Sequence, residues 1–156
     1  YTTRVGNGPF PTEQTNATGT YLQEHGGEIG TVSKRKRRCG WLDLPLLRYA
    51  IRLNGCSGLA VTKLDVLDGL REIGVCSHYR EGSRRLREFP SEMNQLTRCT
   101  PVYKKLEGWH QPIVSLRRRS RLPKRAQAYL SYIEKELGLP VHYVSVGPDR
   151  SALIRR

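Results

Sequence analysis

Residues 62–65 read Thr-Lys-Leu-Asp and follow the apolar run 58–61, so they stand where a buried strand is expected to end. A carboxylate held there can accept two hydrogen bonds, from the N1–H and the 2-amino group of a guanine. Adenine presents no matching pair of donors, so Asp65 would discriminate between the two bases. The stem of Lys63 can lie along the face of the base while its ammonium stays in water. On its own, however, this tetrapeptide favours a solvated strand end.

A second strand-to-loop transition lies near the C-terminus. Residues 141–146 are β-like and run into the turn formed by Gly147 and Pro148. A glycine there lets the backbone approach a flat ligand closely. Ligands of open α/β sheets bind beyond the carboxyl ends of the strands. Two such loops at one sheet edge therefore predict a slot for a nucleotide base.

The charge of the chain is strongly positive, with 27 Lys and Arg against 14 Asp and Glu, a formal net charge of +13. Such a charge suits polyanions, and nucleic acid is the first candidate, but cations also bind the phosphates and carboxylates of small substrates. By its residues alone, the run Lys34–Arg38 is typical of a solvated face or a localisation signal. The run Arg117–Arg121 is typical of a solvated loop.

Cysteine and histidine usage points away from metal and nucleophile chemistry. The four cysteines stand singly, without a C-x-x-C pair, which favours reduced thiols in the cytoplasm over a zinc site. The four histidines have no paired acid or nucleophile at a recognisable spacing. Asn16-Ala17-Thr18 fits a glycosylation acceptor, but without a secretory signal we interpret it as a chance match. No apolar stretch approaches the roughly 20 residues of a membrane helix.

Periodicity and breakers predict an α/β fold, with an open, mostly parallel sheet and flanking helices. Residues 1–40 and 80–100 read as loop and as irregular surface, respectively. Helices are expected at 43–54, capped by Asp43, and at 123–137, which begins at Pro123 and ends at Gly138. Strands are expected at 58–63, 72–79, 101–106, 141–146 and 151–154.

Five ordered blocks give the chain a specific resemblance to a known family. They are Tyr1–Gly6 with Gly8–Glu13, Gly30–Trp41, Leu59–Leu70, Pro101–Tyr103 with Gly108-Trp109, and Ser145–Arg150. In these blocks the chain resembles the C-terminal portion of adenylosuccinate synthetases, nearly from end to end. The resemblance implies a P-loop-like nucleotide-binding architecture. It also implies that residues 1–156 form one portion of the enzyme, with substrate-binding loops in 1–40 and a guanine-binding α/β part in 41–156.

The family joins L-aspartate to IMP at the expense of GTP, a step of purine nucleotide biosynthesis. The resemblance implies these three substrates, Mg²⁺ as cofactor, a cytoplasmic location and a homodimer. The catalytic acid and base, the phosphate loop and the main Mg²⁺ ligands belong to the family's N-terminal region. We therefore expect no catalytic residue and no metal ligand in this chain, and no activity from it in isolation.

The resemblance also assigns site residues, and two of them depart from the family pattern. Val32 stands where we expect Thr, and Lys34 stands where we expect Gly. Planar guanidinium groups suit the two carboxylates of aspartate, so the basic loop is interpreted as a substrate loop. The implied aspartate and IMP ligands are Thr31, Val32, Ser33, Lys34, Arg35, Lys36 and Arg37, with Val5 and Gly6 joining Arg35 at IMP and Arg4 bordering that site. The implied GTP ligands are Arg37, Lys63, Leu64, Asp65, Ser145, Val146, Gly147 and Pro148.

We expect GTP, IMP and L-aspartate as partners, and neither nucleic acid nor a membrane, but two other functions remain open at this point. The chain can be a shortened, catalytically inactive relative that serves as a binding module. It can also be a basic nucleic-acid-binding protein, a hypothesis that rests only on the net charge and the two Arg-rich runs. A steep loss of DNA affinity with salt, together with indifference to GTP, would identify the latter.

Overall fold

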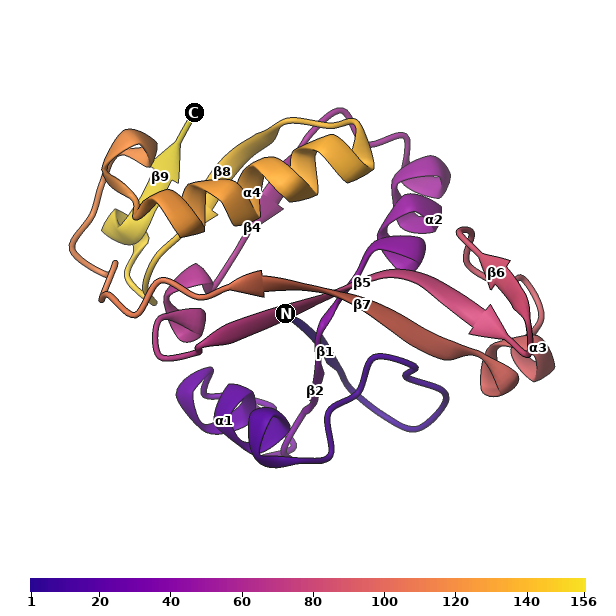
Figure 1. The fold of residues 1–156 in the computed structure, drawn as a ribbon. Coiled ribbons are helices and arrows are strands. Elements are labelled where there is room, and N and C mark those ends of the chain that lie inside the picture. The colour runs from indigo at the N-terminus through magenta and orange to yellow at the C-terminus, as the bar shows by residue number, and fades with distance from the viewer. The chain divides into compact units, whose positions relative to one another are not determined.

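The structure is a computed structural model that describes residues 1–156, and it divides into two compact units. Unit 1 comprises residues 1–50 and 74–105, and unit 2 comprises residues 51–73 and 106–156. Unit 1 therefore holds the predicted substrate loop, and unit 2 holds both predicted guanine-binding loops. Figure 1 shows the fold, with the helices and most of the strands labelled.

Unit 1 consists of paired strands with three helices and a basic loop. β1 pairs β2 in antiparallel fashion, whereas β5 pairs β3 in parallel and β6 in antiparallel fashion, and β7 also pairs β5. A core cluster forms around Cys76, Tyr79 and Leu96. The elements are β1 (Thr2–Arg4), α1 (Ala17–His25), β2 (Arg38–Gly40), β3 (Leu42–Asp43), α2 (Leu44–Asn54), β5 (Glu72–Glu81), β6 (Arg84–Leu86), α3 (Met93–Arg98) and β7 (Thr100–Glu107). Of these, α2, β5 and β7 extend across the boundary of the unit.

Unit 2 is a three-stranded sheet in the order β4-β8-β9 with one long helix. β4 and β8 are parallel, and β8 and β9 are antiparallel. The helix α4 (Lys124–Leu137) buries Ala126, Tyr129, Leu130 and Ile133, as its apolar stripe predicts. The remaining elements are β4 (Leu59–Val61), β8 (Val141–Ser145), β9 (Leu153–Arg155) and the 3-10 turns η1 (Leu64–Leu67), η2 (Arg119–Arg121) and η3 (Arg150–Ala152).

The α/β class with flanking helices is confirmed, together with both long helices and their end signals. Asp43 caps α2, because its Oδ1 accepts a hydrogen bond from the Leu46 amide at 3.1 Å. Gly138 ends α4 in the left-handed conformation, with φ of 68°. The pairs β3–β5 and β4–β8 are parallel, whereas β1–β2, β5–β6 and β8–β9 are antiparallel. The short connections after β5 and β8 can only join antiparallel neighbours.

Two segments expected to be irregular contain regular structure. Residues 1–40 hold α1, whose N-cap Asn16 accepts hydrogen bonds from the amides of Thr18 and Gly19. This cap was missed because the helix buries only Gly19 and Leu22, too narrow a stripe to show as periodicity. Residues 80–100 hold the hairpin between β5 and β6 and the short helix α3. The many charged residues of β5 and β6 obscure the alternation of apolar and polar residues that predicts a strand.

None of the helices combines the length and the apolar character that crossing a bilayer requires.

Candidate functional site

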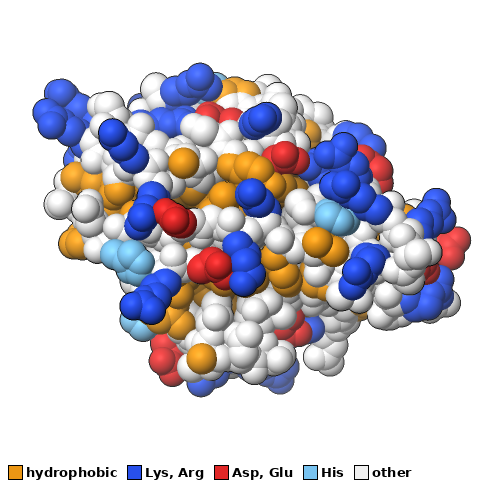
Figure 2. Space-filling view, in the orientation of Figure 1, with side chains coloured by type: hydrophobic (Ala, Val, Ile, Leu, Met, Phe, Trp, Pro, Cys, Tyr) orange, Lys and Arg blue, Asp and Glu red, His pale blue; other side chains and the backbone are white.

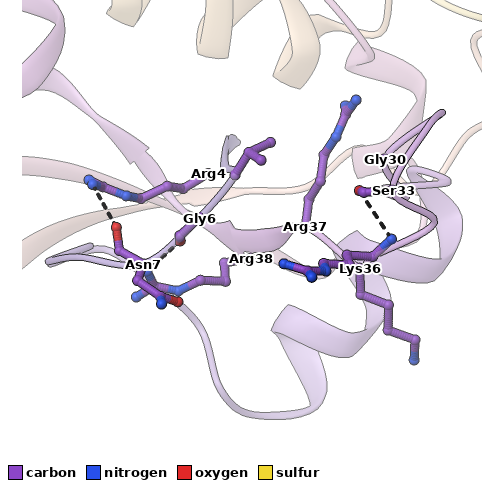
Figure 3. Close-up of a pocket in the computed structure, with 10 residues that line it drawn as sticks. Arg4, Gly6, Asn7, Gly30, Ser33, Lys36, Arg37 and Arg38 are labelled. Carbon is purple, nitrogen blue, oxygen red and sulfur yellow. Dashed lines mark hydrogen bonds between the residues drawn. The ribbon is translucent and has the colours of Figure 1, made fainter.

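A pocket of about 280 Å³ lies in unit 1, where two segments that are distant in sequence face each other. The antiparallel pairing of β1 with β2 sets Arg4 opposite Arg38, so the turn after β1 meets the basic loop before β2. Figure 3 shows the two segments on either side of the pocket. The lining residues are Arg4, Val5, Gly6, Asn7, Gly30, Ser33, Arg35, Lys36, Arg37 and Arg38.

The turn at residues 6–9 is held by two guanidinium groups that bond its four successive carbonyl groups. Arg38 donates to the carbonyls of residues 6 and 8 at 3.4 and 2.8 Å, and Arg4 donates to those of residues 7 and 9 at 3.2 and 2.8 Å. Residues 6 and 8 are glycines with φ of 85° and 117°, which a residue with a Cβ adopts only under strain. Hydrogen bonding thus sets this wall of the pocket without any ligand.

The opposite wall is the turn at residues 30–35. The Lys34 amide donates to the Gly30 carbonyl at 2.9 Å, and the Gly30 amide donates to the Arg35 carbonyl at 2.8 Å. Ser33 Oγ accepts from the Arg35 amide at 3.4 Å. Lys34 has φ of 53°, in the left-handed region that favours glycine, so the structure explains the glycine expected at this position.

Charge in the pocket is only partly compensated by the protein. Arg37 forms an ion pair at 3.1 Å with Glu28, whose side chain is buried, and the Nε of Arg37 is buried without an acceptor. Arg38 pairs with Glu13, and the hydrogen bonds of this pair hold the pKa of Glu13 below its ordinary value. Arg35 and Lys36 are exposed and have no carboxylate partner. The pocket is therefore suited to an anion.

Four of the seven predicted loop residues line this pocket, and so do both predicted IMP contacts of the preceding turn. Ser33, Arg35, Lys36 and Arg37 meet Val5 and Gly6 there. Thr31, Val32 and Lys34 do not line the pocket. Val32 is 95% exposed, so its side chain contacts nothing that would replace the hydroxyl expected at this position. Asn7, Gly30 and Arg38 also line the pocket and were not predicted, because only the strand register brings them there.

In unit 2, the structure brings the two predicted base-binding loops together. β4 and β8 run in parallel with Val61 opposite Val144, so the loops that follow leave the same sheet edge. The Lys63 amide donates to Ser145 Oγ at 3.5 Å, and that hydroxyl donates to the Gly147 carbonyl at 3.1 Å. Lys63 is left-handed, with φ of 57°, and turns the chain from β4 into η1.

Asp65 lies in η1, one turn beyond the strand end. Its Oδ1 is buried and accepts no hydrogen bond, and desolvation raises the pKa of its carboxyl above the ordinary value. A buried carboxylate oxygen without a donor is unusual and calls for a partner from outside the chain. This oxygen is the clearest ligand-directed feature of unit 2.

The other members of the predicted slot divide into packing and surface residues. The side chains of Leu64 and Val146 are fully buried, so only their backbone groups are available to a ligand. Pro148 is exposed. A Cβ at Gly147 would come within 3.0 Å of Val114 and 3.2 Å of Ala152, so packing inside the unit already requires glycine there.

No three His, Cys, Asp or Glu side chains gather to hold a metal ion. We assign no step of this chain to the Mg²⁺ that the resemblance implies. The basic run 117–121 is partly engaged, because Arg119 pairs with Glu134 and Arg117 donates to the carbonyls of Val114 and Leu116.

The chain has two loops that leave strand ends at one edge of an α/β sheet, and it also forms a cationic pocket. These are features of the α/β nucleotide enzymes. Comparison with known families gives a more specific assignment. The sequence profile described as adenylosuccinate synthetase matches residues 1–154, and the chain belongs to this family.

Individual members of the family are similar to this chain along its whole length. It is 49% identical over 156 residues to the adenylosuccinate synthetase of Halothermothrix orenii, covering 100% of this chain and 36% of that protein. It is 47% identical to the one of Lodderomyces elongisporus, with the same coverage. The structure of a fully ligated adenylosuccinate synthetase from Plasmodium falciparum matches with a TM-score of 0.96 and 42% identity, covering 100% of this chain and 38% of that one. The chain thus spans little more than a third of the length of the relatives it matches.

Proposed function

We propose that this chain forms a substrate-positioning part of a GTP-dependent adenylosuccinate synthetase, which converts IMP and L-aspartate to adenylosuccinate in purine biosynthesis. The observation that carries the proposal is the junction of the loops after β4 and β8, with the unpartnered Oδ1 of Asp65 beside it. Membership of the family supplies the reaction. The residues of this chain supply binding and orientation, and the family resemblance further suggests a cytoplasmic homodimer.

The guanine base of GTP is read by Asp65 in this proposal. The N1–H and 2-amino groups of guanine both donate, and a carboxylate accepts two parallel bonds. Desolvation disfavours the charged carboxylate, and these two bonds would offset that cost. Backbone groups at residues 145–148, at and just beyond the end of β8, approach the base. The stem of Lys63 lies along its face.

The pocket in unit 1 receives IMP and aspartate in this proposal. Arg35 is exposed and free of a protein carboxylate, so it can bind a carboxylate of aspartate and approach the ribose of IMP. Arg37 is oriented by Glu28, and the resemblance directs it to GTP. The turn containing Val5 and Gly6 offers backbone groups to IMP. No carboxylate or histidine lines the pocket, so no proton transfer is assigned to these residues.

Titration of the chain with GDP, with ADP as the control ligand, tests the proposal. At about 0.15 M salt, screening mutes nonspecific attraction between the basic chain and either nucleotide. We expect GDP to bind with about millimolar affinity, a free energy near −4 kcal/mol, and ADP to bind more weakly. Equal binding of the two nucleotides would contradict a preformed guanine slot.

The Asp65→Asn variant sharpens the test. Loss of a charged acceptor for two donors should weaken GDP binding about tenfold or more. Xanthine carries an oxygen in place of the 2-amino group, and an asparagine amide can donate to it, so XDP binding should improve. The matched control is Asp149→Asn, an exposed carboxylate just after Pro148. An unchanged preference for GDP in Asp65→Asn would refute the role of Asp65.

A further inference from the structure

The hairpin of β5 and β6 has one apolar face and one basic face. Its register sets Tyr79 opposite Leu86 and Arg80 opposite Arg85. Because side chains alternate along a strand, Tyr79 and Leu86 point into the core cluster around Leu96. Arg80 and Arg85 therefore point away from the core and are exposed.

Two further basic residues extend this face by one position along each strand. His78 lies two residues before Arg80, and Arg87 lies two residues after Arg85, just beyond the end of β6. We call these four side chains the hairpin basic face. Cross-strand neighbours lie about 5 Å apart and same-strand neighbours about 7 Å apart, so the face is a compact two-by-two array.

The charges of the hairpin basic face are not compensated within the protein. Arg80 and Arg85 stand directly opposite each other, and like charges in that position destabilise a strand pair. Glu81, the carboxylate next to this pair, accepts hydrogen bonds from Gln95 at 2.8 Å and Arg98 at 3.0 Å. None of the three arginines of the face forms an ion pair.

Two further observations show that positive potential converges on this face. The pKa of His78 is lowered, first by burial and then by the charges of Arg85, Arg87 and Arg80. Arg48 adds another guanidinium beside the face, because its Nη1 donates to the carbonyls of Ser77 and Arg87 at 3.4 Å each. Blue Lys and Arg side chains are spread over the face of the molecule that Figure 2 shows, in keeping with the net charge of +13.

We propose that the hairpin basic face binds the phosphodiester backbone of nucleic acid without reading its sequence. Fixed guanidinium groups at short spacing need a partner of matching charge density, and a nucleic acid strand carries one phosphate about every 3.4 Å along the axis. Guanidinium groups bind phosphate oxygens through two parallel hydrogen bonds. The face carries no Phe, Tyr or Trp on which a base could stack, so contacts fall on the backbone. This binding is independent of the proposed nucleotide sites.

Fluorescence anisotropy with a labelled DNA duplex of about 20 base pairs of mixed sequence tests the proposal. A face that neutralises about three phosphates gives a slope near −3 in a plot of log affinity against log salt concentration. The double variant Arg80→Gln/Arg85→Gln should reduce the steepness of this slope by about 2 and weaken binding on the order of tenfold at low salt. Its melting temperature should not fall, because the variant removes a repulsive pair.

The matched control is Arg118→Gln/Arg121→Gln, which removes the same charge from exposed positions of the second basic run. We expect this control to retain most of the affinity and of the slope, and saturating GDP to change neither. Equal losses in the two double variants would overturn the proposal, because net charge alone would then explain the binding. Tighter binding of poly-glutamate than of DNA, abolished only in the hairpin variant, would also overturn it and identify an acidic polypeptide as the partner.

Discussion

Arg38 shows how one side chain can shape a site through its neighbours. Its guanidinium group pairs with Glu13 and lies 5.6 Å from the centre of the Phe10 ring. The same group donates to two carbonyls of the turn at residues 6–9. A planar fork with five donors can make all these contacts at once, whereas an ammonium group cannot. Arg38 is thus a positioning residue for the Gly6 wall of the pocket.

Replacing Arg38 with lysine keeps the charge and removes the fork. We expect the turn at residues 6–9 to loosen, so that the backbone order parameters of residues 6–8 fall, and IMP binding to weaken about tenfold. NMR relaxation and titration with IMP measure the two effects. Arg118→Lys, at an exposed position, is the control. Unaltered order parameters at residues 6–8 would show that Arg4 alone holds the turn.

At the scale of elements, Glu134 joins α4 to β8. Its carboxylate accepts from the Val141 amide at 2.8 Å and forms an ion pair with Arg119. The hydrogen bond from Arg119 is the largest of the influences that lower the pKa of Glu134. A charged group therefore couples α4 to β8, the strand that ends at the second predicted base-binding loop.

The lowered pKa of Glu134 predicts a pH dependence of stability. The ionised form is favoured in the folded state, so its contribution is present above about pH 4.5, the ordinary value, and is lost as the pH falls through the folded pKa. Glu134→Gln should lower the free energy of unfolding by about 1–2 kcal/mol at neutral pH. Urea denaturation of both proteins across this range should show the difference shrinking in acid. A constant difference would rule out the ionic contribution, and exposed Glu24→Gln serves as control.

At the scale of the whole chain, the proposed function assigns substrate binding to residues of this chain and proton transfer to none of them. Each unit carries binding features of its own, the cationic pocket in unit 1 and the base-binding loops in unit 2. No three His, Cys, Asp or Glu side chains gather to hold a metal ion, and no carboxylate or histidine lines the pocket.

We accordingly expect the purified chain to form no adenylosuccinate from IMP, L-aspartate, GTP and Mg²⁺. Alignment and charge neutralisation contribute much of the rate of phosphoryl transfer, but the proton must still leave N1 of IMP. Chromatographic detection of adenylosuccinate after long incubation measures the outcome. Product formation would mean that a residue outside the pocket acts as the base.

Local signals in the sequence determined the features that depend on a few neighbouring residues. Asp43 before a helical stripe, Gly138 after α4 and the glycine before Pro148 each act within one turn of chain, so their conformations follow from short-range sterics and hydrogen bonds. The family's blocks likewise predict which segments form the substrate loop and the base-binding loops, and these assignments stay predictions. The cap at Asn16 was just as local, and it was missed only because α1 buries so little.

Strand register, by contrast, was decided by the tertiary structure. Register places Arg38 opposite Arg4, Arg85 opposite Arg80, and Val144 beside Val61. These pairings create the pocket wall, the hairpin basic face and the base-binding junction. Each pairing depends on which strand edges meet after the intervening chain is closed, and the free energy of that choice is spread over the whole packed unit. Residue types and their spacing along the chain do not determine the strand register.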